Sequence, residues 1–223
     1  MSKNNTSSDE QLLRERSLAF FGAVVASVSH ELNNVISIVD QSSGLLEDFA
    51  LMSERGKTPP PEKLRLVADR VGRQTQRGLE IIQRLNTFAH SPDYPKNECN
   101  IVDVVRNITA LSERLADLKK VKLEISLPDR ELQMLIDPFS FQHLFFSIIR
   151  RMLDCSESGE QISVSVVEEG GECIVIIEST IAKYEYKSDE LDILLSGLVP
   201  VRLISDSGGG TTTITLALGD GTA

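Results

Sequence analysis

The 223-residue sequence predicts an α+β protein, in which a long antiparallel helical hairpin precedes a two-layer α/β sandwich. Three observations lead to this prediction. Apolar residues recur every three or four positions over residues 11–55 and again over residues 62–90, as in amphipathic helices. A stretch rich in glycine and proline separates these two segments. Beyond residue 98, short alternating runs typical of strands are interspersed with helical ones.

The first helix is expected to follow a polar start. Residues 1–9 have no apolar pattern, and we expect them to be disordered, whereas residues 10–91 form the helical hairpin. A helix of this length is unusual inside a globular core and favours a coiled coil or a helical bundle. The apolar stripe of this helix consists of Phe21, Val24, Val28, Leu32, Val35, Val39, Leu46 and Phe49.

A turn at residues 56–61 is expected to end the first helix, because Gly56 can close a helix and the prolines after it cannot continue one. Two amphipathic helices bury their stripes poorly on their own, so we expect a homodimer in which two hairpins form a four-helix bundle. The alternative is that the hairpin packs only against the rest of its own chain. The inward face of the second helix consists of Leu64, Val67, Val71, Gly78, Ile81, Leu85 and Phe88.

Residues 98–223 form the second predicted domain, after a linker at residues 91–95. Its pattern indicates helices on one face of a mixed sheet. The Glu-Glu-Gly-Gly run at 168–171 favours a hairpin turn, as do the glycines at 208–210. The expected helices are 102–118, 139–155 and 188–196, and the expected strands are 121–127, 132–136, 162–167, 173–178, 201–205 and 211–218.

Composition limits the classes of function. A net charge of −10 argues against a nucleic-acid-binding surface, which needs a basic patch, and suits a protein with protein partners. No apolar run is long enough to span a bilayer, and the polar start lacks a signal core. Three widely spaced cysteines, at positions 99, 155 and 173, have no metal-ligand spacing and suggest free thiols in a reducing cytoplasm.

The candidate site lies on the first helix, at His30, Glu31 and Asn34. At about 100° per residue, His30 falls roughly opposite the midpoint of Val28 and Leu32, which belong to the buried stripe. Its imidazole is therefore expected to face solvent. Asn34 is one turn further on and shares this face of the helix, and Glu31 flanks His30. A surface histidine among polar neighbours, without chemistry, is the simpler alternative.

The string Ser29-His30-Glu31-Leu32-Asn33-Asn34 resembles the phosphoacceptor box of two-component sensor histidine kinases, which lies on the first helix of their dimerisation and phosphotransfer hairpin. The family often has proline after this asparagine, where this chain has Val35. The second domain resembles the family's ATP-binding domain. Residues 137–144 are similar to the start of its asparagine-box helix, and residues 210–216 are similar to its last strand.

The nucleotide-handling residues implied by this resemblance are absent. Arg151 stands where the magnesium-binding asparagine belongs, and an arginine offers hydrogen-bond donors only. Thr180 and Ala182 occupy positions of the glycines in the adenine-contacting motif. Too few residues separate the short helix from Val201 for a phosphate lid. We therefore expect a degenerate, pseudokinase-like domain that binds no ATP.

The resemblance implies a histidine phosphotransfer protein of a two-component phosphorelay. His30 would exchange phosphoryl groups with receiver-domain aspartates of response regulators, and Glu31 would orient or deprotonate its ring. No cofactor is expected in this chain, because the receiver supplies the magnesium ion. One alternative is a response-regulator phosphatase that uses Glu31 and Asn34, whose amide could hold the attacking water.

A further alternative is a non-catalytic scaffold or antagonist that blocks a receiver or a sensor kinase, and autokinase activity is the least favoured. The other two histidines have a structural interpretation, His143 on the apolar helix and His90 at a helix end. Arg150 and Arg151 could mark a partner surface, an inverted anion site or a solvated helix edge.

Overall fold

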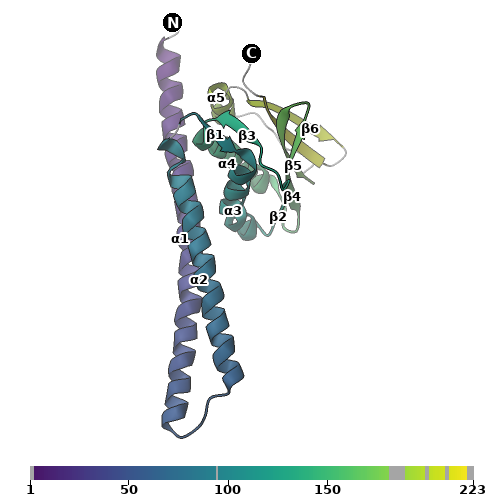
Figure 1. The fold of residues 1–223 in the computed structure, drawn as a ribbon. Helices are drawn as coiled ribbons and strands as arrows, with labels where there is room; N and C mark the ends of the chain where they lie inside the picture. Colours follow the sequence, from purple (N-terminus) through teal and green to yellow (C-terminus); the bar gives the residue numbers. More distant parts are fainter. Residues whose placement is uncertain (1–2, 94, 181–188, 199–200, 209–210, 220–223) are drawn as a thin grey trace. The chain divides into compact units, whose positions relative to one another are not determined.

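The contacts divide the chain into two compact units. Residues Met1–Val24 with Phe88–Ala223 form the α/β unit, and residues Val25–Thr87 form the hairpin unit. The division differs from the linker predicted at residues 91–95, because the first turns of the long helix group with the α/β unit. The computed structural model (Figure 1) describes residues 3–93, 95–180, 189–198, 201–208 and 211–219.

The two long helices of the predicted hairpin are both present, as α1 (Lys3–Glu54) and α2 (Pro61–Ala89). Helix α1 has 52 residues and begins well before the expected position. Residues 3–9, which we expected to be disordered, are therefore helical. The physical reason is that each residue added to an existing helix gains a hydrogen bond without a new nucleation step.

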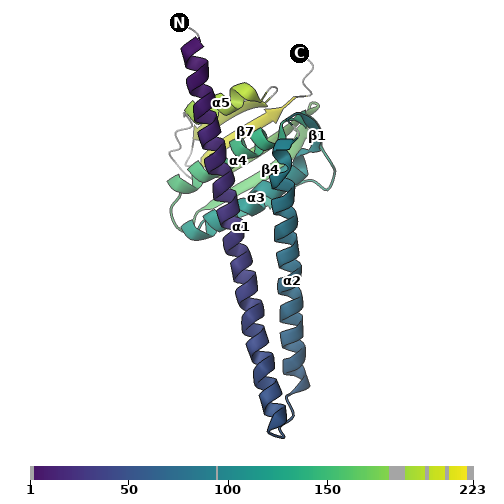
Figure 2. The ribbon, with the colours of Figure 1, turned by 90° about the vertical axis from the view of Figure 1, so that its left-hand side faces the viewer.

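The turn between the two helices follows the glycine and proline signals. Gly56 has a φ of 72°, which is the left-handed conformation that favours glycine. The Gly56 N–H donates to the Ser53 carbonyl at 3.0 Å, and the Lys57 N–H donates to the Met52 carbonyl at 3.0 Å. This is a Schellman motif, and it satisfies carbonyls that the end of α1 would leave unpaired. Within the hairpin unit, α2 then runs back alongside α1 (Figure 2).

The apolar stripes of the hairpin unit are partly buried, with buried and half-buried positions following one another, and Leu64 of the α2 stripe is 38% exposed. Val28 and Val35 of α1 are buried, as are Val67 and Ile81 of α2. Leu46, which was expected in the stripe, is 43% exposed. A two-helix hairpin offers each stripe only one neighbour, so part of its apolar surface stays in contact with solvent.

The α/β unit contains a five-stranded mixed sheet of order β2-β4-β5-β7-β6. β2 pairs with β4 in parallel, and all the other pairs are antiparallel. Gly170 and Gly171 have φ values of 61° and 85° at the predicted hairpin turn. Gly209 and Gly210, in the second predicted turn, lie outside the described residues. The strands are β2 (Lys122–Ser126), β4 (Gln161–Glu169), β5 (Glu172–Ser179), β6 (Val201–Gly208) and β7 (Thr211–Leu218).

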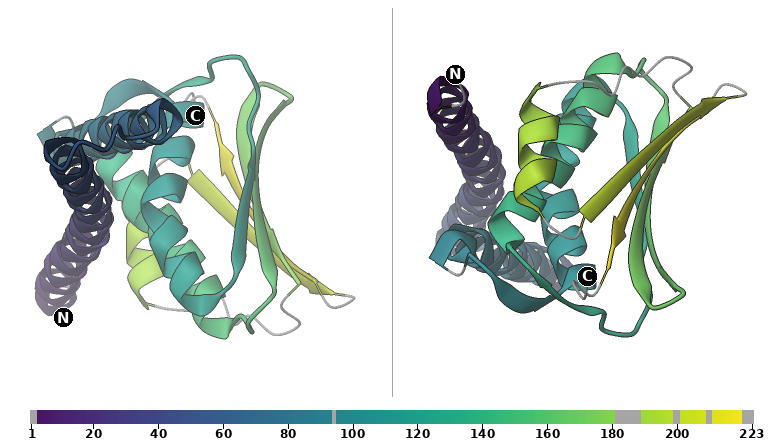
Figure 3. Two further views of the ribbon diagram at one scale, coloured as in Figure 1. Left: turned by 90° about the horizontal axis from the view of Figure 1, so that it is seen from below. Right: turned by 90° about the horizontal axis from the view of Figure 1, so that it is seen from above.

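Helices α3 (Ile101–Lys119), α4 (Pro138–Cys155) and α5 (Asp189–Gly197) cover one face of this sheet, as predicted (Figure 3). The Asp137 carboxylate caps α4 by accepting the Phe139 and Ser140 N–H groups at 3.0 and 3.1 Å. Alternate residues of β4, β5 and β7 point into the core and are buried, as the period of a strand requires.

Two short elements were not predicted. β1 (Asn97–Asn100) pairs antiparallel with β3 (Gln133–Ile136) in a separate two-stranded sheet. A 3-10 turn, η1 (Ser91–Asp93), lies in the expected linker, of which Tyr94 is outside the described residues. The sequence of β1 shows no alternation of apolar residues, and its strand conformation depends on pairing with a segment more than 30 residues away.

The start of α1 packs into an aromatic cluster of the α/β unit. Phe20 is 3% exposed, stacks on His143 at 4.8 Å between ring centroids, and meets Phe88 edge-on at 5.3 Å. His143 is buried and therefore structural, as expected. His90 is exposed and binds Asp93 at 2.9 Å. No helix in the described part of the chain has an apolar run of the length a bilayer requires.

Candidate functional site

His30 lies on the solvent-facing side of α1, in the hairpin unit. Its side chain is exposed, whereas Val28, two residues earlier, is only 1% exposed. The helical period therefore separates the two residues as expected from the sequence. The imidazole is open to a visiting macromolecule, because a buried stripe holds the opposite side of the helix.

Asn34 contacts the ring of His30. Its Nδ2 lies 3.3 Å from His30 Nδ1, and both side chains are exposed. In this orientation the amide donates to Nδ1, so the neutral ring has its proton on Nε2. Turning the amide by 180° brings its oxygen to Nδ1–H and leaves Nε2 with a free lone pair. Asn34 can therefore stabilise either neutral tautomer, and the second is the nucleophilic one at Nε2.

Glu31 is turned toward the second helix of the hairpin. Its Oε2 lies 3.9 Å from Nη2 of Arg77 on α2, with side-chain exposures of 17% for Glu31 and 58% for Arg77. The carboxylate is thus partly buried and has a cationic neighbour across the hairpin. A carboxylate held in this way provides a fixed negative charge beside the imidazole face.

Arg77 was not identified from the sequence. Which residue of α2 lies opposite Glu31 depends on the register of the hairpin, and periodicity within one helix does not determine that register. Its neighbour Gly78 provided a signal, since glycine inside a helix is unfavourable and often marks close packing. A Cβ at Gly78 would lie 3.3 Å from Cγ1 of Val35, so the two helices approach closely beside Asn34.

The arrangement has two chemical capabilities. A neutral imidazole with an exposed nitrogen is a nucleophile for a phosphoryl group. An exposed amide that donates and accepts can hold a water molecule for attack on an acyl phosphate. Among the described residues, no group of three or more histidine, cysteine or acidic side chains could hold a metal ion.

The residues expected at the nucleotide positions are found in the α/β unit. Arg151 is on α4 and half-buried, and Thr180 directly follows β5 and is exposed. Ala182 lies outside the described residues, as do residues 199 and 200 in the segment where a lid was judged absent. Arg151 presents a guanidinium in this region of α4, which favours anions over cations.

Two of the three cysteines are shielded from solvent. Burial raises the pKa of Cys99 from 9.0 to about 11, with a smaller contribution from Asp137. Burial likewise raises the pKa of Cys173 to about 11, with a smaller contribution from Glu168. These thiols stay protonated at neutral pH and are poor nucleophiles.

No protein-family model matches the chain, and no curated protein matches it. Solved structures do. The catalytic domain of histidine kinase ThkA, in a nucleotide-free form, is 9% identical, has a TM-score of 0.50, and matches over 56% of this chain and 96% of its own. The Acinetobacter baumannii histidine kinase AdeS is 14% identical over 86% of this chain and 98% of its own, with a TM-score of 0.48.

A crystal structure of ThkA in complex with the response regulator protein TrrA is 14% identical, with a TM-score of 0.49 over 99% of this chain and 67% of that one. The similarity to the isolated ThkA catalytic domain is one of fold, and it agrees with the resemblance drawn from the sequence. The chain therefore combines a long helical hairpin with an α/β domain that has the histidine kinase catalytic fold.

Proposed function

We propose that the protein is a histidine phosphotransfer protein of a two-component phosphorelay, with a response-regulator receiver domain as its partner. The observation that supports this proposal best is the exposed imidazole of His30 in contact with Asn34. An imidazole held on a rigid helix and open to solvent meets the geometric requirement for attack on a partner's phosphoryl group.

The proposed step exchanges one bond for another. The Nε2 lone pair of His30 attacks the phosphorus of a receiver aspartyl phosphate, the N–P bond forms, and the P–O bond to the aspartate breaks with its electron pair leaving on the carboxylate. Attack leaves the ring as a cation whose Nδ1–H donates to the Asn34 carbonyl oxygen, and loss of this proton to solvent makes the phosphorylated ring neutral. Magnesium bound in the receiver would neutralise the phosphoryl oxygens, so this chain needs no cofactor of its own.

Glu31 and Arg77 act on this step as positioning residues. The Glu31 carboxylate is tied to Arg77, so we assign it the role of a fixed charge that orients the incoming partner, rather than that of a mobile base. Arg77→Ala removes the cation that positions the Glu31 carboxylate but does not change Glu31 itself, and it should lower the rate of phosphotransfer. Arg77→Lys, which retains the cation, should recover part of this rate.

The test is transfer of label from a phosphorylated receiver. Cognate receivers of the source organism, charged with labelled phosphate, are incubated with the wild-type protein and with His30→Gln. We expect acid-labile, base-stable label on the wild type and none on the variant. His90→Gln is the matched control, because His90 is also exposed but is paired with Asp93. Absence of label with every receiver would refute the transferase.

A receiver phosphatase is the second candidate, and the exposed amide of Asn34 favours it. In this reaction water, held by Asn34, attacks the aspartyl phosphate, and His30 is not phosphorylated. Asn34→Ala should then abolish loss of label from the receiver, whereas His30→Gln should retain it. Loss of this activity in His30→Gln identifies the transferase, for which Asn34→Ala should only slow the transfer of label. Binding of a receiver that survives both substitutions, with no turnover, identifies a scaffold.

We also propose that two hairpins associate as a four-helix bundle. The hairpin unit exposes a set of large apolar side chains, and a second copy of this chain would cover them. Ile36→Glu combined with Ile82→Glu should convert the dimer into a monomer in light scattering. Leu18→Glu, at an exposed leucine of the α/β unit, is the matched control and should leave the mass unchanged. The exposed set is Ile36, Leu45, Leu46, Leu51, Leu64, Leu66, Leu79 and Ile82.

A further inference from the structure

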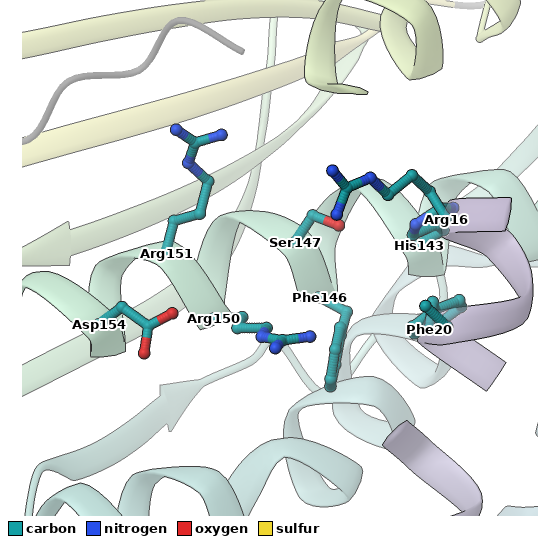
Figure 4. Close-up of a pocket in the computed structure, with 9 residues that line it drawn as sticks. Arg16, Phe20, His143, Phe146, Ser147, Arg150, Arg151 and Asp154 are labelled. Atoms are coloured by element: carbon teal, nitrogen blue, oxygen red, sulfur yellow. The ribbon is translucent and has the colours of Figure 1, made fainter. Parts of the chain in front are cut away.

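Three arginines line a pocket of about 160 Å³ in the α/β unit, and their guanidinium groups point in different directions around it (Figure 4). Arg16 comes from α1, and Arg150 and Arg151 come from α4. Figure 4 shows the guanidinium of Arg16 extending toward Ser147, which lies one helical turn before Arg151. Residues 143, 147 and 151 are spaced by four, so α4 presents them along one line of its surface.

The positive charge of this pocket is not balanced locally. Among the described residues, Asp154 is the one acidic residue that lines it, and its Oδ1 already binds Lys119 Nζ at 3.0 Å. In the described part of the chain, none of the three arginines (Arg16, Arg150 and Arg151) forms an ion pair. The whole chain has a net charge of −10, so a cluster of three positively charged side chains is unusual for this protein.

The walls of the pocket are well packed. Phe20 and Phe146 are 3% and 2% exposed, and Ser147 is 8% exposed, so this part of the lining is held in place by the core. Arg151 is half-buried beside this wall, whereas Arg16 and Arg150 are exposed. The packed wall distinguishes the pocket from a row of arginines along a fully solvated helix edge.

We propose that this pocket binds a phosphate group, either as inorganic phosphate or as the phosphoryl group of a small metabolite. The planar fork of a guanidinium matches two phosphate oxygens, and no other side chain does so as well. A cavity of about 150 Å³ holds a molecule the size of benzene, whereas sites for larger ligands occupy about 300 Å³ or more. The pocket therefore has room for a phosphate group.

The experiment is calorimetric titration of the full chain with three probes: inorganic phosphate, glycerol 3-phosphate and magnesium–ATP. We expect saturable binding of the first or the second, weakened by added salt. Arg16→Gln and Arg151→Gln should each weaken it by about tenfold or more, since each removes a charge-assisted hydrogen bond. Arg14→Gln is the matched control, because Arg14 is an exposed arginine of the same helix that does not line the pocket.

The outcomes separate the sources of the phosphate. Binding of glycerol 3-phosphate alone supports the metabolite, and binding of both probes supports a site for the phosphate group itself. Lack of saturable binding by either probe overturns the proposal, as does equal binding by wild type and Arg16→Gln with unchanged unfolding temperatures. Binding of magnesium–ATP alone also overturns it. His30→Gln should bind the probe as the wild type does, so failure of the phosphotransfer proposal would leave this result intact.

Discussion

The closeness of α1 and α2 can be tested by changing glycine to alanine at two positions of α2, Gly72 and Gly78, and comparing the stabilities of the two variants. A Cβ at Gly72 would meet no atom within 4 Å, whereas a Cβ at Gly78 would lie 3.3 Å from Cγ1 of Val35. Both glycines lie inside the same helix and the same unit. Alanine therefore changes the backbone preference equally at the two positions, and only the contact with Val35 differs.

The expected magnitudes follow from this difference. Alanine is favoured over glycine in a helix by about 1 kcal/mol, so Gly72→Ala should raise the free energy of unfolding by about that amount. At Gly78 the new methyl is closer to Val35 than the optimum of about 3.5–4.0 Å, and the β-branched Val35 has little rotamer freedom. Gly78→Ala should gain nothing, and Gly78→Val should lose about 1–3 kcal/mol through overpacking.

The assay is urea unfolding followed by the helical circular dichroism signal, at two protein concentrations so that dimer dissociation is recognised. The order of midpoints should be Gly72→Ala, wild type, then Gly78→Val, with Gly78→Ala at or below the wild type. If Gly78→Ala stabilises the protein as much as Gly72→Ala does, the close approach of α1 and α2 at this point is refuted.

Phe20→Ala should lower the free energy of unfolding by about 3–5 kcal/mol, because a buried ring leaves a cavity in the aromatic cluster; calorimetry showing less than about 1 kcal/mol would contradict this packing. Asp137→Ala should lower it by about 1 kcal/mol through loss of the N-cap of α4, and Asp137→Asn, which keeps the acceptor, should recover most of this in a urea titration. Because burial raises the pKa of Cys99 and Cys173 from 9.0 to about 11, stability should be full below pH 9 and fall toward pH 11, where unfolded thiols ionise first. At mildly alkaline pH an alkylating reagent should modify the exposed Cys155 before either of these, and mass spectrometry showing equal rates would refute their burial.

Much of the fold was predictable because its signals are local. The helical period, the Gly56 turn and the alternation in β4, β5 and β7 each depend on residues close together in the sequence. The two misassigned segments depend on something else. β1 is a strand because β3 is available to pair with it, and residues 3–9 are helical as the continuation of a helix that already exists.

In the candidate site, the features that depend on a single helix could be predicted from the sequence, and those that join two helices could not. The exposure of His30 and its contact with Asn34 follow from positions within one helix, which period and rise determine. The ion pair between Glu31 and Arg77 joins two helices, and it depends on a register that neither helix encodes alone. Likewise, the pocket that Arg16 and Arg151 both line is formed by segments more than 130 residues apart.

The contact between Asn34 and His30 engages one end of the amide at a time. While the amino group meets Nδ1, the carbonyl oxygen is open to a solvent molecule, and after a 180° turn the amino group is open in its place. Under the proposed function, the way this amide is turned would set whether Nε2 is ready to accept a phosphoryl group, and which group is left outward to hold a water molecule.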